Sequence, residues 1–354
     1  MKNVQSDVTR RGFGLGASAT MASLLLPGDA AAQLAADAEK VLHEAAKADG
    51  ELTWYDAHHH VELAEAFGTA FTAKYPGVKV NVVRTTANIA YQRVAQELKA
   101  GSLQCDVLSS TDISHCMDLK TKGLLEKFVP ANAQTVIAPL QNADPDGFFH
   151  VTSTGTIAVT YNSGKVKPED VPKKWTDLLD PKWKNQVSVG HPGFSGYVSI
   201  WVYEMDRLYG WQYFEKLKAN NPQIGRSIQD TLTHLRSGER MVAAGSTSTA
   251  FESKVKGEPI DVAYQEDGTI IIVAPSCILK GAKRPNAAKL FMEFMSGPAA
   301  SQIAVDYFGE SIHAAIKPKA GKSLDQLKTI IAKPDLLIKA QADLKEKWRE
   351  TFGV

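Results

Sequence analysis

Short apolar segments alternate with stretches of helical spacing in the first third of the chain. The segments with strand character are residues 51–55, 78–83 and 105–110, and those with helical spacing are residues 60–75, 90–99 and the stretch that ends at Gly123. Pro76 and Gly77 end the first helical stretch, and Asp112 can cap the third. This β-α-β-α-β-α order predicts a parallel sheet that is covered by helices on both faces.

A long β-rich run at residues 149–162, with Gly155 inside it, separates this unit from a second α/β pattern. The second pattern consists of strands at residues 186–190, 241–245 and 261–265 and of helices at residues 195–208, around Trp211, and at residues 231–237 and 247–255. Residues 269–279 are apolar and β-branched, which predicts a buried strand that returns to the first unit. Further helical patterns follow Pro285 and Pro298 and cover residues 335–351.

We therefore predict an α/β fold in which two Rossmann-like lobes are joined by a β hinge and can close like a clam. The first lobe is expected to comprise residues 33–155 and 270–354, and the second lobe residues 156–269. A chain of 354 residues is long enough for two domains of roughly 100–200 residues each.

The first 32 residues have the pattern of an export signal. Arg10 and Arg11 form a twin-arginine pair, a weakly apolar run follows at residues 15–26, and residues 30–32 offer a small-residue cleavage site. The apolar run is too short for a membrane-spanning helix, which needs about 20 apolar residues. We expect a periplasmic protein whose signal is cleaved near Ala32, by the twin-arginine route rather than the general secretory route.

The charges of the chain are balanced. It has 40 basic and 39 acidic residues, and removal of residues 1–32 takes away three basic and two acidic ones, which leaves no net charge. Such a chain has no basic block with which to bind nucleic acid. Three cysteines do not describe a disulfide framework. We expect a monomer that carries no cofactor.

Polar residues gather where the predicted strands end and the next helices begin. Parallel sheets bind ligands beyond the carboxyl ends of their strands, and helix amino termini favour anions because their N–H groups are unpaired. Each such residue taken alone is more often an ordinary helix cap, but their joint placement favours a site. The residues that we expect to line it are His58, His59, Ser109, Ser110, Thr111, Ser153, Thr154, His191, Gly193, Ser195, Gly196, Tyr197, Ser246, Thr247, Ser248, Gln265 and Glu266.

The histidine run at residues 58–60 admits three interpretations. At least one ring can hydrogen-bond an anion, the run can supply metal ligands together with His191, or it can be a solvated helix start. A metal site takes three or four ligands, and the spacing does not show them. Arg84 and Arg93 are further candidates for an anion clamp, although the position of Arg93 fits a solvated helix surface better. Ser311 and His313 follow an irregular stretch and could contribute from the first lobe.

Enzyme motifs are weak in this chain. Residues 193–197 approach a nucleophile elbow around Ser195 but lack its final glycine, and no Walker A motif occurs. We therefore predict that the protein is not an enzyme. A hydrolase that uses Ser195 with His191 is kept as the least favoured alternative.

Several stretches resemble type 2 periplasmic binding proteins of the group that contains the ferric-ion, hexose-phosphate and phosphonate receptors. They are ELTWYDAHH, FTAKYPGVKVNVV, CDVLSSTD, KGLLEKF, WTDLLDPKWKNQV and IIIVAPSCILKGAKRPNAAKLFMEFMSGPAASQ, and the resemblance covers the whole mature chain. It implies a ligand cleft between the lobes and delivery of the ligand to a membrane permease that is driven by a separate ATPase.

One departure from this group concerns the ligand. Ferric-ion members have an adjacent tyrosine pair after a strand like residues 241–245, whereas this chain has Ser246, Thr247 and Ser248 there. We therefore predict the periplasmic substrate-binding component of an ABC importer for a small anion such as a phosphate ester, phosphonate or carboxylate. The alternative is a receptor for ferric or another metal ion that uses histidines instead of the tyrosine pair.

Overall fold

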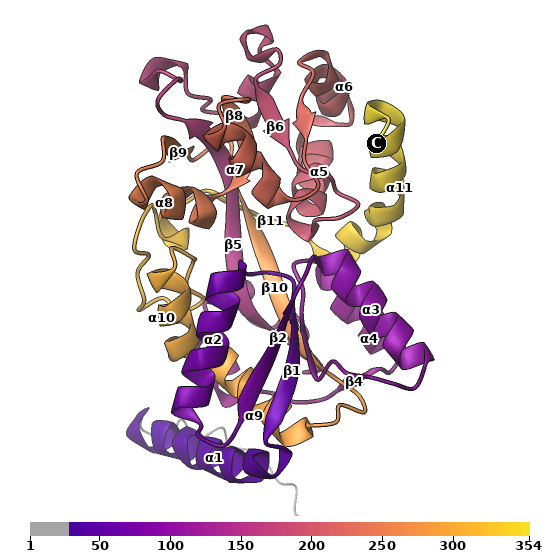
Figure 1. Cartoon of the computed structure of the whole chain (residues 1–354), viewed down its shortest axis with the longest axis vertical. Helices are drawn as coiled ribbons and strands as arrows, with labels where there is room; N and C mark the ends of the chain where they lie inside the picture. Colours follow the sequence, from indigo (N-terminus) through magenta and orange to yellow (C-terminus); the bar gives the residue numbers. More distant parts are fainter. Residues whose placement is uncertain (1–27) are drawn as a thin grey trace, which may run out of the picture.

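Two long strands run through the molecule and connect its two lobes (Figure 1). The structure is a computed structural model that describes residues 28–354, with side chains from residue 37 onward. Strand β5 (Phe149–Asn162) is antiparallel to β10 (Thr269–Leu279), and the paired stretch runs from Phe149 beside Cys277 to Ile157 beside Ile270. The sheet is therefore continuous from one lobe to the other.

The other strands are arranged on both sides of this central pair. Their bounds are β1 (Glu51–Asp56), β2 (Lys79–Arg84), β3 (Val107–Ser109), β4 (Leu125–Glu126), β6 (Val187–Val189), β7 (Gln223–Ile224), β8 (Val242–Ser246), β9 (Ile260–Ala263) and β11 (Thr329–Ile331). The order β2-β1-β3-β10-β5-β8-β6-β7 places the parallel strands β2, β1 and β3 in the first lobe, and β8, β6 and β7 in the second. Strands β4 and β11 pair with β10, and β9 pairs with β5.

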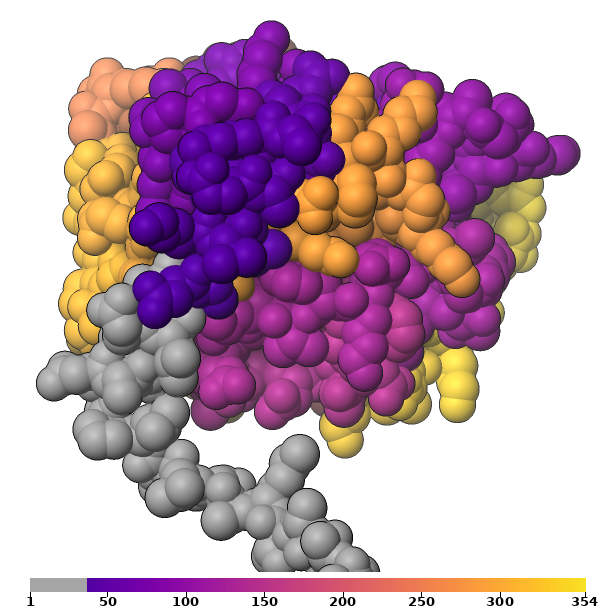
Figure 2. All heavy atoms as spheres, turned by 90° about the horizontal axis from the view of Figure 1, so that it is seen from below, coloured from indigo at the N-terminus to yellow at the C-terminus, as the bar shows by residue number. Residues whose placement is uncertain are grey.

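Helices surround both halves of the sheet. The first lobe contains α1 (Gly28–Asp49), α2 (Val61–Lys74), α3 (Ala87–Lys99), α4 (Ile113–Thr121), α9 (Pro285–Met295) and α10 (Pro298–Asp306). The second contains α5 (Gly196–Tyr209), α6 (Gln212–Ala219), α7 (Ile228–Arg236) and α8 (Thr247–Val255). Short 3-10 helices lie at Ala131–Thr135, Ala138–Leu140, Pro168–Asp170, Trp175–Leu179, Pro181–Trp183 and Leu324–Gln326. In the view from below, the indigo residues of α1 lie beside the orange segment that holds α9, and these two helices pack together (Figure 2).

Strand β1 is buried on both faces, as the parallel pattern predicts. Trp54 is fully buried and packs against Phe67 of α2 and Phe291 of α9, with ring centroids 6.2 and 5.0 Å away. The next residue, Tyr55, faces the opposite core together with residues of α3 and α4. Both cores are apolar, so hydrophobic burial fixes the helices on either side of the sheet.

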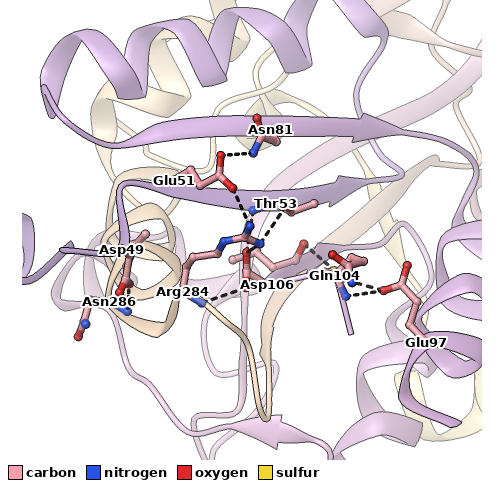
Figure 3. A network of polar contacts seen from close by, with 12 residues as sticks. Asp49, Glu51, Thr53, Asn81, Glu97, Gln104, Asp106, Arg284 and Asn286 are labelled. Carbon is pink, nitrogen blue, oxygen red and sulfur yellow. Dashed lines mark hydrogen bonds and ion pairs between the residues drawn. The ribbon is translucent and has the colours of Figure 1, made fainter. Parts of the chain in front are cut away.

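A polar network lies at the amino ends of the strands of the first lobe (Figure 3). Arg284, just before α9, contacts the buried carboxylate of Asp106 at 3.2 Å and the partly exposed carboxylate of Glu51 at 2.6 Å. Asp49, at the end of α1, accepts hydrogen bonds from the backbone N–H groups of Asn286 and Ala287 at the start of α9. The network therefore ties α1, β1 and β3 to the amino end of α9.

The final helix, α11 (Pro334–Phe352), packs against α5 and α6 of the second lobe and also contacts α4 of the first (Figure 1). Strand β11 precedes it and pairs with the start of β10. Further along β10 the register with β5 shifts between Ala274 and Pro275, where proline cannot donate a ladder hydrogen bond. The C-terminal segment thus touches both lobes near the place where they join.

The predicted α/β fold of two lobes joined by β strands is confirmed. The strands and helices expected after residue 50 are present, whereas α1, β4, β7 and β11 were not predicted. The lobe boundaries stay a prediction; the first, at residue 155, falls inside β5. The twin-arginine pair lies outside the described residues, and the expected cleavage position at Ala32 falls within α1. Among the described helices none has the length and apolar character to span a membrane.

Candidate functional site: a closed cleft between the lobes

Two small cavities lie between the lobes at the carboxyl ends of β1 and β2. The Arg84 compartment has a volume of about 70 Å³ and is lined by Ala57, His58, Arg84, Thr86, Thr111, Ser195, Gly196, Tyr197, Ser227, Ile228 and Gln229. The Glu310 compartment has a volume of about 20 Å³ and is lined by His58, His59, His60, Leu63, Ser153, Thr154, Tyr197, Gln229, Ser246, Ser248, Thr249, Ala304, Gly309 and Glu310. The two compartments adjoin, because His58, Tyr197 and Gln229 line both.

The lobes are closed over these compartments. The side-chain amide of Asn88 on α3 donates to the backbone oxygen of Gly193 in the second lobe at 2.7 Å. The rings of His58 and Tyr197 stack across the cleft, 5.7 Å apart and inclined by 15°. Gly196 lies so close to Thr111 that a Cβ atom at residue 196 would meet the Thr111 hydroxyl at 2.3 Å. A larger residue at position 196 would therefore hold the lobes apart.

Asp56, the last residue of β1, organises the histidine run from a fully buried position. Its carboxylate accepts hydrogen bonds from the backbone N–H groups of His58 and His59 at 3.0 and 3.2 Å, and it contacts Nδ1 of His59 at 3.2 Å. Burial raises the pKa of Asp56, but the charge and hydrogen bonds of His59 and the charge of Arg84 outweigh it, so the pKa is lowered. Asp56 is therefore ionised at neutral pH.

The three histidines of the run have three different environments. His59 is held at both ring nitrogens, by Asp56 and by Ser153 Oγ at 3.0 Å, and has none left for a ligand. His60 caps α2 by accepting from the N–H of Leu63 and contacts Glu62 at 3.0 Å. His58 is buried, and its Nδ1 has no hydrogen-bond partner within the described residues. Nε2 of His60 is likewise buried without a hydrogen-bond partner within the described residues, but it lies 3.9 Å from the carboxylate of Glu252.

Burial sets the protonation state of His58. Desolvation, aided by the neighbouring charge of His59, lowers the pKa of His58 well below its ordinary value, and a hydrogen bond to the backbone of Thr154 opposes this only in part. The ring is therefore neutral at neutral pH. Since the Thr154 carbonyl can only accept, the His58 nitrogen bonded to it is the protonated one, and Nδ1 is left as an acceptor.

Cationic and donor groups converge on the Arg84 compartment. Arg84, the last residue of β2, donates from Nε to the backbone oxygen of His59 and from Nη1 to that of Thr85, whereas Nη2 has no partner within the described residues. The hydroxyl of Thr86 is buried and has no hydrogen-bond partner among the described residues. Thr86 and Ser195 are the cap residues of α3 and α5, and neither makes a side-chain cap. The compartment thus combines a guanidinium group with two uncapped helix amino ends.

A carboxylate, Glu310, lies at the other end of the cleft. Helix α10 is terminated by Phe308 in the left-handed region at φ 64, with Gly309 N–H bonded to the oxygen of Ala304 at 2.8 Å, which is a Schellman motif. The next residue is Glu310, whose Oε1 accepts from the hydroxyl groups of Thr247, at 2.7 Å, and Thr156. Burial raises the pKa of Glu310, and these hydrogen bonds offset the rise only in part.

Tyr197 forms the wall between the compartments. Burial, together with the charge of Glu310, raises its pKa well above the ordinary value, so its hydroxyl stays protonated. The hydroxyl lies over Gly155 of β5, where a Cβ atom would approach it to 2.0 Å. The glycine inside this long strand therefore has a steric role, because it makes room for the tyrosine.

The structure brings about half of the predicted site residues together. Those that line the two compartments are His58, His59, Thr111, Ser153, Thr154, Ser195, Gly196, Tyr197, Ser246 and Ser248. Thr247 lines neither compartment, but its hydroxyl donates a hydrogen bond to the carboxylate of Glu310. The predicted residues that line neither compartment are Ser109, Ser110, His191, Gly193, Gln265 and Glu266.

Most of these outlying residues have structural contacts elsewhere. Ser109 bonds Trp54 and Ser276, Ser110 bonds His115, and Gln265 accepts from the N–H of Val159. His191 accepts at Nδ1 from the N–H of Gly193 at 2.9 Å, and Glu266 is exposed. Ser311 and His313 line a separate cavity on the first lobe.

Sequence reasoning missed Thr86, Ser227, Gln229 and Glu310 as cleft residues. Thr86 and Ser227 are the cap residues of α3 and α7, so the strand-end argument that selected Ser195 could have found them. Glu310 gives no such signal, because it follows the last turn of a helix rather than the end of a strand.

No group of three or more histidine, cysteine, aspartate or glutamate side chains in the described part of the chain is arranged to hold a metal ion. The histidine alternative for a metal ion is further weakened by His59 and His191, whose ring nitrogens Nδ1 are both engaged within the protein.

Two α/β lobes that share a sheet and close over a polar cleft define a type 2 periplasmic binding protein fold. AfuA of Actinobacillus pleuropneumoniae, with fructose-6-phosphate bound, has this fold and matches with a TM-score of 0.77 at 22% identity, over 86% of this chain and 99% of AfuA. Iron-bound HitA of Pseudomonas aeruginosa matches with a TM-score of 0.72 at 21% identity, over 84% of this chain and 98% of HitA.

Sequence comparison identifies the family. The model of the bacterial extracellular solute-binding protein family matches residues 105–329. A putative 2-aminoethylphosphonate-binding periplasmic protein of Salmonella typhimurium is 22% identical over 281 residues, which are 76% of this chain and 77% of that protein. The chain belongs to the bacterial extracellular solute-binding protein family, whose members are binding proteins.

Proposed function

We propose that this chain is the solute receptor of an ABC importer and that it holds a small oxyanion in the Arg84 compartment. The observation that carries the proposal is that Arg84 Nη2 and the buried hydroxyl of Thr86, which line the same compartment, have no hydrogen-bond partner within the described residues. The uncapped amino ends of α3 and α5 add N–H donors and partial positive charge. Phosphate esters, phosphonates and carboxylates all present the oxygen atoms that such a group of donors binds.

The size of the compartment favours a compact ligand group. A cavity needs about 10–15 Å³ on this measure for one water molecule, so about 70 Å³ holds a handful of non-hydrogen atoms. That space suits a phosphonate, phosphate or carboxylate group with a short chain. In the closed state it leaves no room for a ligand as large as a hexose phosphate.

Ferric ion is less well supported than an oxyanion. Strand β8 ends at Ser246 and is followed by Thr247 and Ser248, and Tyr197 is the one tyrosine of the described residues that lines either compartment. A hard trivalent ion would need several oxygen anions, and Glu310 and Tyr197 supply at most two.

Hydrolysis is also poorly supported. The chemistry would need the hydroxyl of Ser195 to be hydrogen-bonded to a base. The described residues show no side-chain hydrogen bond between Ser195 and His191, whose Nδ1 accepts from the N–H of Gly193 instead.

Arg84→Gln tests the oxyanion site. Isothermal titration with inorganic phosphate, ethylphosphonate and acetate is expected to show binding of at least one of them to the wild type. The variant should bind it roughly 10- to 100-fold more weakly, because hydrogen bonds to charged groups contribute about 1.5–3 kcal/mol.

Arg93→Gln is the matched control, since Arg93 is half-exposed on α3 and pairs with Glu97. Equal affinities of wild type and Arg84→Gln would remove Arg84 from the site. A thermal shift with ferric citrate and none with any oxyanion would reverse the choice of ligand.

Periplasmic location and a partner permease are part of the same proposal. The family description places such proteins outside the cytoplasm, and the N-terminal sequence has the pattern of a twin-arginine signal. N-terminal sequencing of protein recovered from the periplasm is expected to begin near Gln33. Recovery of the full-length chain from the cytoplasm alone would contradict this.

A further inference from the structure

The two ends of the cleft carry opposite charges. Arg84 lines one compartment and Glu310 the other, and the two compartments share His58, Tyr197 and Gln229. A second oxyanion beside Glu310 would face a carboxylate, so the two compartments are suited to different chemical groups. A molecule that fills both compartments must therefore carry a negatively charged group at one end and a positively charged or hydrogen-bond-donating group at the other.

Glu310 lacks a cationic partner. Within the described residues its carboxylate accepts hydrogen bonds from the hydroxyl groups of Thr156 and Thr247 and from the backbone N–H groups of Thr156 and Glu310, and no lysine, arginine or histidine pairs with it there. Glu310 is partly buried, and a carboxylate that is partly withdrawn from water without a counter-charge is costly, so proteins retain one chiefly where function requires it. A cation from the ligand would complete this site.

His58 adds an acceptor where the two compartments meet. Its ring is bonded to the backbone of Thr154, and its Nδ1 is buried without a partner among residues 37–354. A bare nitrogen acceptor is satisfied by an N–H or O–H group, not by an oxyanion. The wall between the compartments therefore also favours a ligand that carries donors.

We propose that the cleft selects a short zwitterion, with its oxyanion against Arg84 and Thr86 and its protonated amine against Glu310 and His58. This inference rests on the proposed function, because the oxyanion end is the site described above. It adds the second half of the ligand and the residue that recognises it.

The volumes agree with this orientation. The Glu310 compartment, about 20 Å³, holds one group the size of a water molecule. An unsubstituted ammonium group fits that space, whereas a trimethylated one does not. The name of the Salmonella relative mentions a compound of this class, but the unpaired Glu310, not a relationship at 22% identity, carries the inference.

The test compares two probes that differ only in the amine. The dissociation constants of 2-aminoethylphosphonate and ethylphosphonate are measured by isothermal titration at neutral pH, and β-alanine and propionate provide the same comparison for a carboxylate. The amine-bearing member of a pair is expected to bind at least tenfold more tightly, as a charge-assisted hydrogen bond predicts. In Glu310→Gln the ratio within each pair is expected to fall toward one.

Glu169→Gln, an exposed carboxylate on the second lobe, is the matched control and should keep the wild-type ratio. If the amine gives no advantage in the wild type, or if Glu310→Gln leaves the ratio unchanged, the zwitterion inference is wrong while the oxyanion site stands. If no probe with an oxyanion binds at all, the proposed function itself fails.

Discussion

At the scale of single residues, the cleft combines groups that the fold leaves incomplete. Arg84 Nη2, Thr86 Oγ1 and His58 Nδ1 have no partners within the described residues, and Glu310 has no counter-charge there. Buried polar groups in folded proteins are otherwise almost always paired. His58 Nδ1 and Thr86 Oγ1 both line the adjoining cavities, where the proposed ligand would complete them.

Ligand-free Glu310→Gln is expected to be more stable than the wild type at pH 7.5. Because burial raises the pKa of Glu310 above its ordinary value of about 4.5, the folded wild type holds this proton more tightly than the unfolded chain. Its stability therefore falls as the pH rises through the window between 4.5 and the raised value. The difference in melting temperature between variant and wild type should be largest at pH 7.5 and should shrink towards pH 4.5.

Glu169→Gln should show no such pH-dependent gain. A stabilisation by Glu310→Gln that did not change with pH, or a loss of stability at pH 7.5, would contradict the account of Glu310 as a partly buried carboxylate without a counter-charge.

The site could be predicted from the sequence only in part, for physical reasons. His58, Thr111 and Ser195 follow strands that local patterns reveal, and parallel topology then places them at one edge of the sheet. Glu310 reaches the cleft only because Phe308 adopts a left-handed conformation at the end of α10. A backbone geometry that is rare for phenylalanine leaves no signature in the pattern of residues.

At the scale of secondary-structure elements, the strong patterns predict the fold well. From residue 51 to residue 123, the alternation of apolar segments with stretches of helical spacing correctly predicts strands β1 to β3 and helices α2 to α4. The β-branched segment at residues 269–279 is strand β10. The missed strands β4, β7 and β11 have two or three residues each. Such strands exist because a longer neighbour pairs with them, which their own residues do not reveal.

Arg284→Ala is expected to reduce the free energy of unfolding by about 2 kcal/mol or more, because it leaves the buried carboxylate of Asp106 without its cation. The network lies at the amino ends of the strands (Figure 3), whereas the two compartments lie at the carboxyl ends of β1 and β2. The affinity for the ligand should therefore be unchanged. Urea denaturation and isothermal titration of the same preparation measure both quantities.

Arg349→Ala removes an exposed arginine that pairs with Glu346 on α11 and should cause no measurable loss. An equal loss of unfolding free energy in the two variants, or a weaker ligand affinity in Arg284→Ala, would show that the network does not stabilise the first lobe independently of the cleft.

At the scale of the whole molecule, closure depends on a few contacts between the lobes. The hydroxyl of Ser110 bonds His115, His115 bonds the side-chain oxygen of Asn88, and Asn88 donates to Gly193 of the second lobe. Asn88 lines neither compartment. It can therefore influence affinity only through the equilibrium between open and closed states.

Asn88→Ala is expected to weaken ligand binding roughly fivefold, since one hydrogen bond contributes about 1 kcal/mol. Small-angle scattering should show a larger radius of gyration than for the wild type without ligand, and equal radii at saturation. Gln92→Ala, on the exposed face of the same helix, is the control. Equal radii without ligand would show that this contact does not govern closure.

The strands that both lobes share also affect how the chain folds during its synthesis. Each lobe uses one part of β5 and one part of β10, and Trp54 of β1 meets Phe291 only after most of the chain has been synthesised. Contacts between such distant residues slow folding. The first lobe therefore cannot mature while the second is still on the ribosome, so a chain cut short before β10 would expose an unfinished sheet edge to aggregation.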